Sequence, residues 1–138
     1  MAELFVPVRP ESVNAERKLS HRARGEHTAA MREASRLLAG EISHWRLKLL
    51  PVLVIATPFQ RGGILADTGN HYPSVKAAID GLVDAGWMPD DTPAYVAGIL
   101  MLPPLRPAEG APSGLHLRVV PAEHHRELLA LTFRPIIG

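Results

Sequence analysis

The sequence predicts a small α/β domain of the α+β type, in which a mixed sheet of four to five short strands packs against two main helices. Short apolar and β-branched segments alternate with segments whose apolar residues follow helical spacing, the pattern expected of such a fold. The length of 138 residues and a hydrophobic content of 46% suit one compact core. We therefore expect a single domain over residues 1–138.

The apolar segments predict the strands. Residues 51–59, PVLVIATPF, are continuously apolar and are expected to form a central strand that is covered on both faces. Residues 3–8 are expected at the border of the sheet because Pro7 cannot donate a ladder hydrogen bond. Two further strands are expected at residues 95–102 and 115–120, with a Pro-rich loop between them.

Two segments have helical spacing. The first is expected to run from Thr28, which can cap it, to about Ile42, with Trp45 as a possible extension. The second is expected to have about 13 residues and to end before Gly86, where a left-handed residue is usual. Its buried stripe is spaced i, i+3, i+4, i+7 and i+8, and consists of Val75, Ala78, Ile79, Leu82 and Val83.

The connecting segments carry three further expectations. Residues 9–27 are polar and lack a hydrophobic period, so we expect either a mobile basic loop that lies along DNA phosphates or an ordinary solvated loop. After a turn at residues 61–63, residues 64–66 are expected to complete a hairpin and to deliver Asp67 to its end. The tail at residues 122–131 is expected to add a turn or two of helix.

Composition excludes several classes of function. Because the chain has no cysteine, any metal must be held by oxygen or imidazole. No apolar run approaches the roughly 18–20 residues of a membrane span, and the first 20 residues do not resemble a signal peptide, so we expect a cytoplasmic protein without a membrane partner. No P-loop, dinucleotide fingerprint, HExxH or GxSxG motif is present, so we expect no nucleotide cofactor.

Charge is distributed unevenly along the chain. Before Gly62 there are 10 Lys and Arg against 6 Asp and Glu, and after it there are 5 against 8. A basic half and an acidic half are what a nuclease needs, one surface for phosphates and another for cations. An asymmetry of this size also occurs where charged residues merely cover solvated faces.

The most informative segment is residues 64–92, where acidic residues flank the second expected helix. Asp67 precedes this helix, Asp90 and Asp91 follow it, and Lys76 lies in its first exposed turn. A helix of about 13 residues spans about 20 Å. The two acidic sites can therefore converge on one cation only if the chain folds back.

The run from Asp67 to Asp91, DTGNHYPSVKAAIDGLVDAGWMPDD, resembles the RusA family of Holliday junction resolvases (crossover junction endodeoxyribonucleases), particularly its phage and actinobacterial members. VPVRPESVNAE, near the start, is similar to the family's opening strand and Pro-x-Ser-x-Asn loop. The order of elements also matches, so the resemblance covers about residues 4–120 and leaves residues 121–138 as a C-terminal extension.

The resemblance implies a RusA-like, structure-specific endonuclease. It would resolve four-way DNA junctions by Mg²⁺-dependent phosphodiester hydrolysis in recombination and repair, with Mn²⁺ as a possible substitute. A homodimer is implied because resolution takes two matched cuts, which a two-fold pair of sites provides. A cytoplasmic protein encoded by a phage or a bacterial chromosome is implied as well.

The resemblance also implies which residues form the site. Asp67, Lys76 and Asp91 would be catalytic: the two aspartates would bind the metal with Asp90 in reserve, and the lysine would stabilise the charged transition state or the leaving group. The implied DNA-binding residues are Asn14, Arg17, Lys18, Arg22, Arg24 and Asn70. Simpler interpretations stay open, because the aspartates can be turn formers and Lys76 can form an exposed i,i+4 pair with Asp80.

One position departs from the family pattern. The family usually has Asp-x-Asp-Asn where this chain has Asp67-Thr68-Gly69-Asn70, so Gly69 replaces a carboxylate expected to help bind metal. A water can fill the gap, or Asn70 or His71 can substitute. Alternatively, the protein binds branched DNA without cutting it, or is a small scaffold with neither activity.

Overall fold

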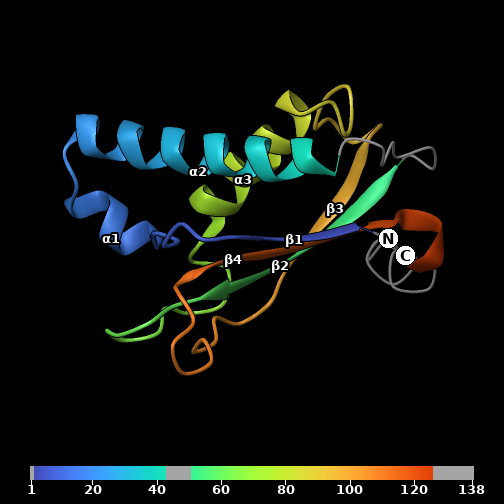
Figure 1. Ribbon diagram of the computed structural model, residues 1–138. Coiled ribbons are helices and arrows are strands. Elements are labelled where there is room, and N and C mark those ends of the chain that lie inside the picture. The colour runs from blue at the N-terminus through green and yellow to red at the C-terminus, as the bar shows by residue number, and fades with distance from the viewer. Residues whose placement is uncertain (1, 43–50, 126–138) are drawn as a thin grey trace, which may run out of the picture.

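The computed structural model describes residues 2–42 and 51–125, and its centre is a four-stranded sheet of strand order β1-β4-β2-β3 (Figure 1). The strands are β1 (Ala2–Val6), β2 (Val52–Phe59), β3 (Val96–Met101) and β4 (Gly114–Pro121). β4 pairs antiparallel with both β1 and β2, and β2 pairs parallel with β3. The α+β fold and its mixed sheet are confirmed, with β2 in the interior of the sheet and β1 at an edge.

The helices cover one face of this sheet (Figure 1). They are the short α1 (Val13–Lys18), the long α2 (His21–Glu41) and α3 (Tyr72–Asp84), and a 3-10 turn, η1 (Ala122–His125), follows β4. α3 connects β2 to its parallel neighbour β3, as a parallel pair requires. The expected tail helix is described only as far as η1, and Trp45 lies outside the described residues.

The expectation of a mobile loop at residues 9–27 is wrong, because most of this segment is helical. The Ser12 hydroxyl caps α1 by accepting a hydrogen bond from the Ala15 amide (3.1 Å). The Ser20 hydroxyl caps α2 in the same way by accepting one from the Ala23 amide (3.1 Å). α2 therefore starts two turns before the expected Thr28. Hydrophobic spacing does not predict α1, because this helix has no buried residue. The cap at Ser12, and not an apolar stripe, specifies where it starts.

The expected hairpin at residues 64–66 is also absent, because the segment between β2 and α3 forms a loop. The side-chain amide of Gln60 donates to the carbonyls of Gly62 (3.2 Å) and Ile64 (3.0 Å). Both Gly62 and Gly63 have positive φ, 74° and 70°. The chain therefore turns away from β2 and does not pair with it.

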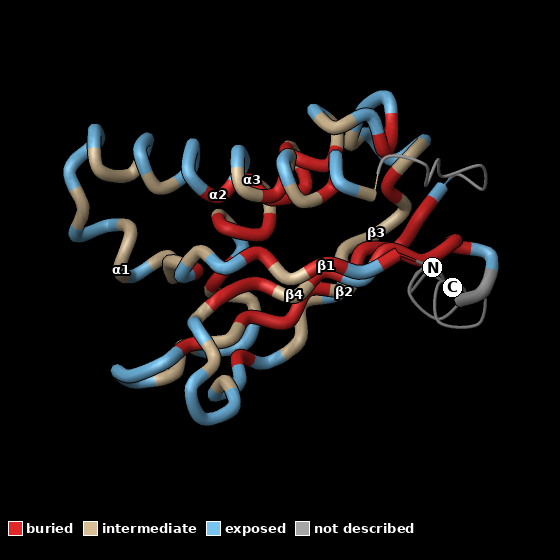
Figure 2. The backbone as a smooth tube through the Cα atoms, in the orientation of Figure 1, coloured by how far each residue is buried: buried red, intermediate tan, exposed pale blue. Residues whose placement is uncertain are grey.

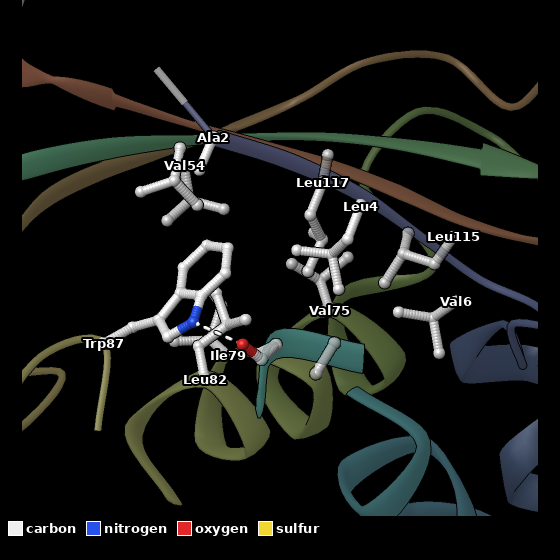
Figure 3. Close-up of a cluster of buried hydrophobic side chains, with 14 of the residues drawn as sticks. Ala2, Leu4, Val6, Val54, Val75, Ile79, Leu82, Trp87, Leu115 and Leu117 are labelled. Atoms are coloured by element: carbon white, nitrogen blue, oxygen red, sulfur yellow. Dashed lines mark hydrogen bonds between the residues drawn. The ribbon is translucent and has the colours of Figure 1, made fainter. Parts of the chain in front are cut away.

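The core lies between the sheet and the helices, where the buried residues of the strands face those of α3 (Figure 2). Alternate residues of β1 and β4 point into it, and they meet the apolar stripe of α3 (Figure 3). The Trp87 indole closes one end by donating to the Ala39 carbonyl at 3.0 Å. The core therefore joins α3 to α2 and to all four strands.

α2 and α3 pack closely because Gly81 has no side chain. A Cβ at this position would lie 2.4 Å from the Arg32 carbonyl oxygen and 2.8 Å from the Ser35 Cβ. In the same interface the Ser35 hydroxyl donates to the Ala78 carbonyl (2.7 Å), and Arg32 makes a bidentate ion pair with Asp84 (2.6 and 2.8 Å). The burial of α3 thus depends on a glycine in its middle.

We expect Gly81→Ala to lower the free energy of unfolding by about 1–3 kcal/mol, because the added methyl group must push the helices apart. Gly25→Ala is the matched control: Gly25 lies within α2 and nothing is within 4 Å of an added Cβ. That variant should gain about 0.5–1 kcal/mol from helix propensity. Urea unfolding measures both, and equal effects would contradict the close contact.

Candidate functional site

The chain reverses direction directly after α3. Gly86 has a φ of 84°, its amide donates to the Val83 carbonyl (2.9 Å), and the Trp87 amide donates to the Leu82 carbonyl (3.1 Å). These are the two bonds of a Schellman motif, which ends a helix and redirects the chain. Trp87 and Met88 are then buried, so the acidic turn that follows is held close to α3.

This reversal brings Asp91 back to the second turn of α3, where it meets Lys76. The Lys76 ammonium donates to the carboxylate of Asp91 and also to that of Asp80 (2.7 Å). We call Lys76, Asp80 and Asp91 the lysine–aspartate cluster. Two of the residues implied to be catalytic, far apart in sequence, are therefore in direct contact.

The cluster is partly shielded from solvent, with side-chain exposures of 39% for Lys76 and 27% for Asp91. The hydrogen bond from Lys76 lowers the pKa of Asp91, and burial opposes it only in part. Burial lowers the pKa of Lys76, but its hydrogen bonds to Asp80 and Asp91 outweigh this effect and the net pKa is raised. Both groups are consequently charged at neutral pH.

Asp90 has a structural role beside this cluster. It is exposed, and one of its carboxylate oxygens accepts a hydrogen bond from the Asp91 amide at 2.8 Å. This bond shapes the turn, as the simpler interpretation of the sequence allowed. The other carboxylate oxygen leaves Asp90 available as the reserve ligand.

Asp67 lies in a tight turn in front of α3. The Asn70 amide donates to the Asp67 carbonyl (3.1 Å), and Gly69, third in the turn, has a φ of 88°. Positive φ at this position is what a type II turn requires and what favours glycine. The departure from the family pattern at Gly69 thus has a conformational reason.

Each acidic site lies at the N-terminal half of α3. Asp67 is five residues before Tyr72, the first residue of α3, and Asp91 is at the second turn. Asp67 is exposed, and its carboxylate has no hydrogen bond or ion pair with any described residue. Within residues 2–42 and 51–125, no group of three or more His, Asp or Glu side chains could hold a metal ion.

His71, considered as a substitute ligand, faces the interior. The residue is only 2% exposed, and neither ring nitrogen has a hydrogen-bond partner among the described residues. Burial lowers its pKa, with the nearby Glu11 backbone opposing the shift in part. A cation at the exposed turn would reach this ring only if the loop opened.

The residues implied to bind DNA gather around α1. Asn14, Arg17 and Lys18 are exposed on this helix, and its Val13 amide donates to the Asn70 carbonyl at 2.8 Å. The basic helix is therefore fastened to the turn that carries Asp67. Arg22 and Arg24 lie in the first turn of α2, where Arg22 pairs with Glu26 (3.1 Å) and Arg24 is partly buried.

The sequence placed Arg9 in the basic segment at residues 9–27 but did not predict that it would lie near Arg61 and Arg106. Their side chains meet around the loop after β2, donating to backbone carbonyls of residues distant in sequence. No local spacing signals such a cluster, because each arginine comes from a different loop.

We expect Lys76→Met to raise the pKa of Asp91, because the ammonium that stabilises its carboxylate is removed. The wild-type ion pair stabilises the fold above the ordinary carboxyl pKa, and this contribution is lost as pH falls through the depressed pKa of Asp91. Carboxyl titration by NMR measures the change. Asp80→Asn is the control, since it keeps the Lys76–Asp91 contact, and an unchanged titration in Lys76→Met would contradict the structure.

Comparison of the chain with protein-family models, with curated proteins and with solved structures returns no match.

Proposed function

We propose that the chain is a metal-dependent endonuclease that cuts branched DNA, resembling the RusA resolvases. The observation that carries this proposal is the contact between Lys76 and Asp91. It holds the second acidic turn beside α3, and Asp67 lies just before the start of the same helix. A carboxylate, a lysine and a second carboxylate on one half of α3 are the groups that phosphodiester hydrolysis uses.

Asp67 and Asp91 would hold the metal. Both supply hard oxygen ligands, and Mg²⁺ commonly takes one or two carboxylates, several waters and oxygens of the substrate phosphate. The free carboxylate of Asp67 and the charged carboxylate of Asp91 fit that sparse donor set. When bound, the ion supplies an activated water and neutralises charge on the phosphate. Mn²⁺ would suit the same ligands.

Lys76 would neutralise charge on the phosphate undergoing cleavage. Its ammonium has three donors, and two carboxylates occupy two of them, so one remains for a phosphate oxygen. The ion pairs with Asp80 and Asp91 restrict the ammonium to the site, which favours a preorganised donor. Asn14, Arg17 and Lys18 would contact flanking phosphates, since α1 is bonded to the turn at Asn70.

A second candidate is a protein that binds branched DNA without cutting it. The absent carboxylate at Gly69 favours this alternative, because only two acidic ligands remain and the described residues hold no group of three or more metal-binding side chains. The basic helix and the fold would be unchanged. Both candidates place two sites in a homodimer, which matches the two-fold symmetry of a four-way junction.

We expect the wild-type chain to cut a synthetic four-way junction with Mg²⁺ or Mn²⁺, and Asp67→Asn and Asp91→Asn to lose more than about 100-fold in rate. Glu41→Gln, which removes an exposed carboxylate at the end of α2, is the matched control and should retain full activity. Gel analysis of labelled junction strands measures cleavage.

The outcomes separate the candidates. Junction binding without cleavage in either metal would select the non-catalytic binder. Neither binding nor cleavage at low salt would reject both DNA functions, because phosphate contacts are strongest there. Full cleavage by both aspartate variants would place the active site elsewhere.

We also expect Gly69→Asp to increase Mn²⁺ affinity and the cleavage rate, because it adds a carboxylate to the turn. Nothing lies within 4 Å of an added Cβ, and the positive φ costs an aspartate about 1–2 kcal/mol. Gly69→Asn carries the same backbone strain without the charge and is the control. Equal metal affinity in the two variants, measured by calorimetry, would exclude this position from the site.

A further inference from the structure

The loop between β2 and α3 presents an isoleucine to solvent. Ile64 is 92% exposed, the highest exposure among the large hydrophobic residues of the described chain. The loop extends from the end of β2, at the lower left of Figure 1, and Figure 2 shows it as exposed. A side chain this exposed is not part of the core and is accessible to a partner.

This loop is held in place by many hydrogen bonds. Arg106 donates to the carbonyls of Gln60 (3.1 Å), Gly62 (2.9 Å) and Gly63, and Gln60 donates to Gly62 and Ile64. The Arg9 guanidinium donates to the Arg61 carbonyl at 2.6 Å. The isoleucine is therefore presented by a preorganised loop, built on two successive left-handed glycines.

The same bonds hold positive charge beside the loop. Arg9, Arg61 and Arg106 donate to neutral backbone carbonyls, and within the described residues none of them forms an ion pair with a carboxylate. All three are exposed. An apolar tip on a loop flanked by three guanidinium groups, none paired with a carboxylate of the described chain, suits a polyanion that also offers flat apolar surfaces.

We propose that the Arg61–Ile64 loop is a wedge that enters the branch point of DNA, with Ile64 against exposed bases and the arginines on adjacent phosphates. This inference rests on the DNA binding proposed above, but not on cleavage. Apolar side chains that enter a base step pay a few kcal/mol of unstacking. At a branch point the stacking is already interrupted, so the wedge is favoured there over continuous duplex.

The position of the wedge also explains how a branch could be aligned with the site. Asp67 follows Ile64 by three residues, which limits their Cα atoms to about 11 Å apart. A branch point held at Ile64 would thus present a strand next to the first acidic turn. The loop would recognise the form of the DNA and not its sequence.

The test uses a four-way junction with 2-aminopurine beside the branch point, titrated with the full chain in EDTA so that cleavage cannot contribute. We expect fluorescence to rise as the base unstacks. Ile64→Ser should still bind but lose this rise, together with about tenfold of the preference for junction over duplex in anisotropy titrations. Ile64→Met, which keeps an apolar tip, should retain both.

Leu37→Ser is the matched control, because Leu37 is also exposed but lies on α2. Junction binding with no fluorescence rise in the wild type, or an unchanged rise in Ile64→Ser, would overturn the wedge and leave the proposed function intact. Absence of binding to any DNA would overturn both. Binding to phosphatidylserine vesicles instead, lost in Ile64→Ser, would assign the loop to a membrane surface and contradict the wedge.

Discussion

The candidate site depends on one electrostatic contact, between the Lys76 ammonium and the Asp91 carboxylate. α3 alone would separate the acidic segments at its two ends by about 20 Å. The Schellman motif at Gly86 and the burial of Trp87 reverse the chain, and the ion pair fixes the acidic turn beside the helix. Backbone geometry, core packing and charge thus all hold the acidic turn at Asp90 and Asp91 against α3.

The other half of the site is specified by backbone conformation. The turn from Asp67 to Asn70 requires positive φ at Gly69. The Asn70 carbonyl accepts a hydrogen bond from the amide of Val13, the first residue of α1. The turn therefore links the basic helix to the start of α3. A carboxylate at position 69 would have to adopt a backbone conformation that favours glycine, which gives a physical reason for Gly69 in this turn.

Much of the fold could be predicted from the sequence, because its signals are local. The β-branched run of β2, the stripe of α3 and the stop at Gly86 each follow from spacing or backbone preference. α1 was missed because it buries no residue and is specified by the cap at Ser12. The loop after β2 was mistaken for a hairpin because the bonds from Arg106 that hold it come from a distant segment.

The candidate site was predictable only in part. The pairing of Lys76 with Asp80 follows from i,i+4 spacing, whereas the arrival of Asp91 depends on a chain reversal that spacing does not encode. The resemblance to RusA resolvases named the residues, and the fold placed the lysine with one aspartate. In the proposed site, water molecules and substrate oxygens would complete the coordination of a cation that Asp67 and Asp91 share.

Paramagnetic broadening by Mn²⁺ in NMR spectra of the ¹⁵N-labelled chain tests this central claim most directly. The account predicts that the amides of the turn at Asp67 and of the turn at Asp91 broaden together at the same Mn²⁺ concentration, while amides near Glu41 are unaffected. Broadening of only one of the two turns, or of neither, would contradict a shared cation site.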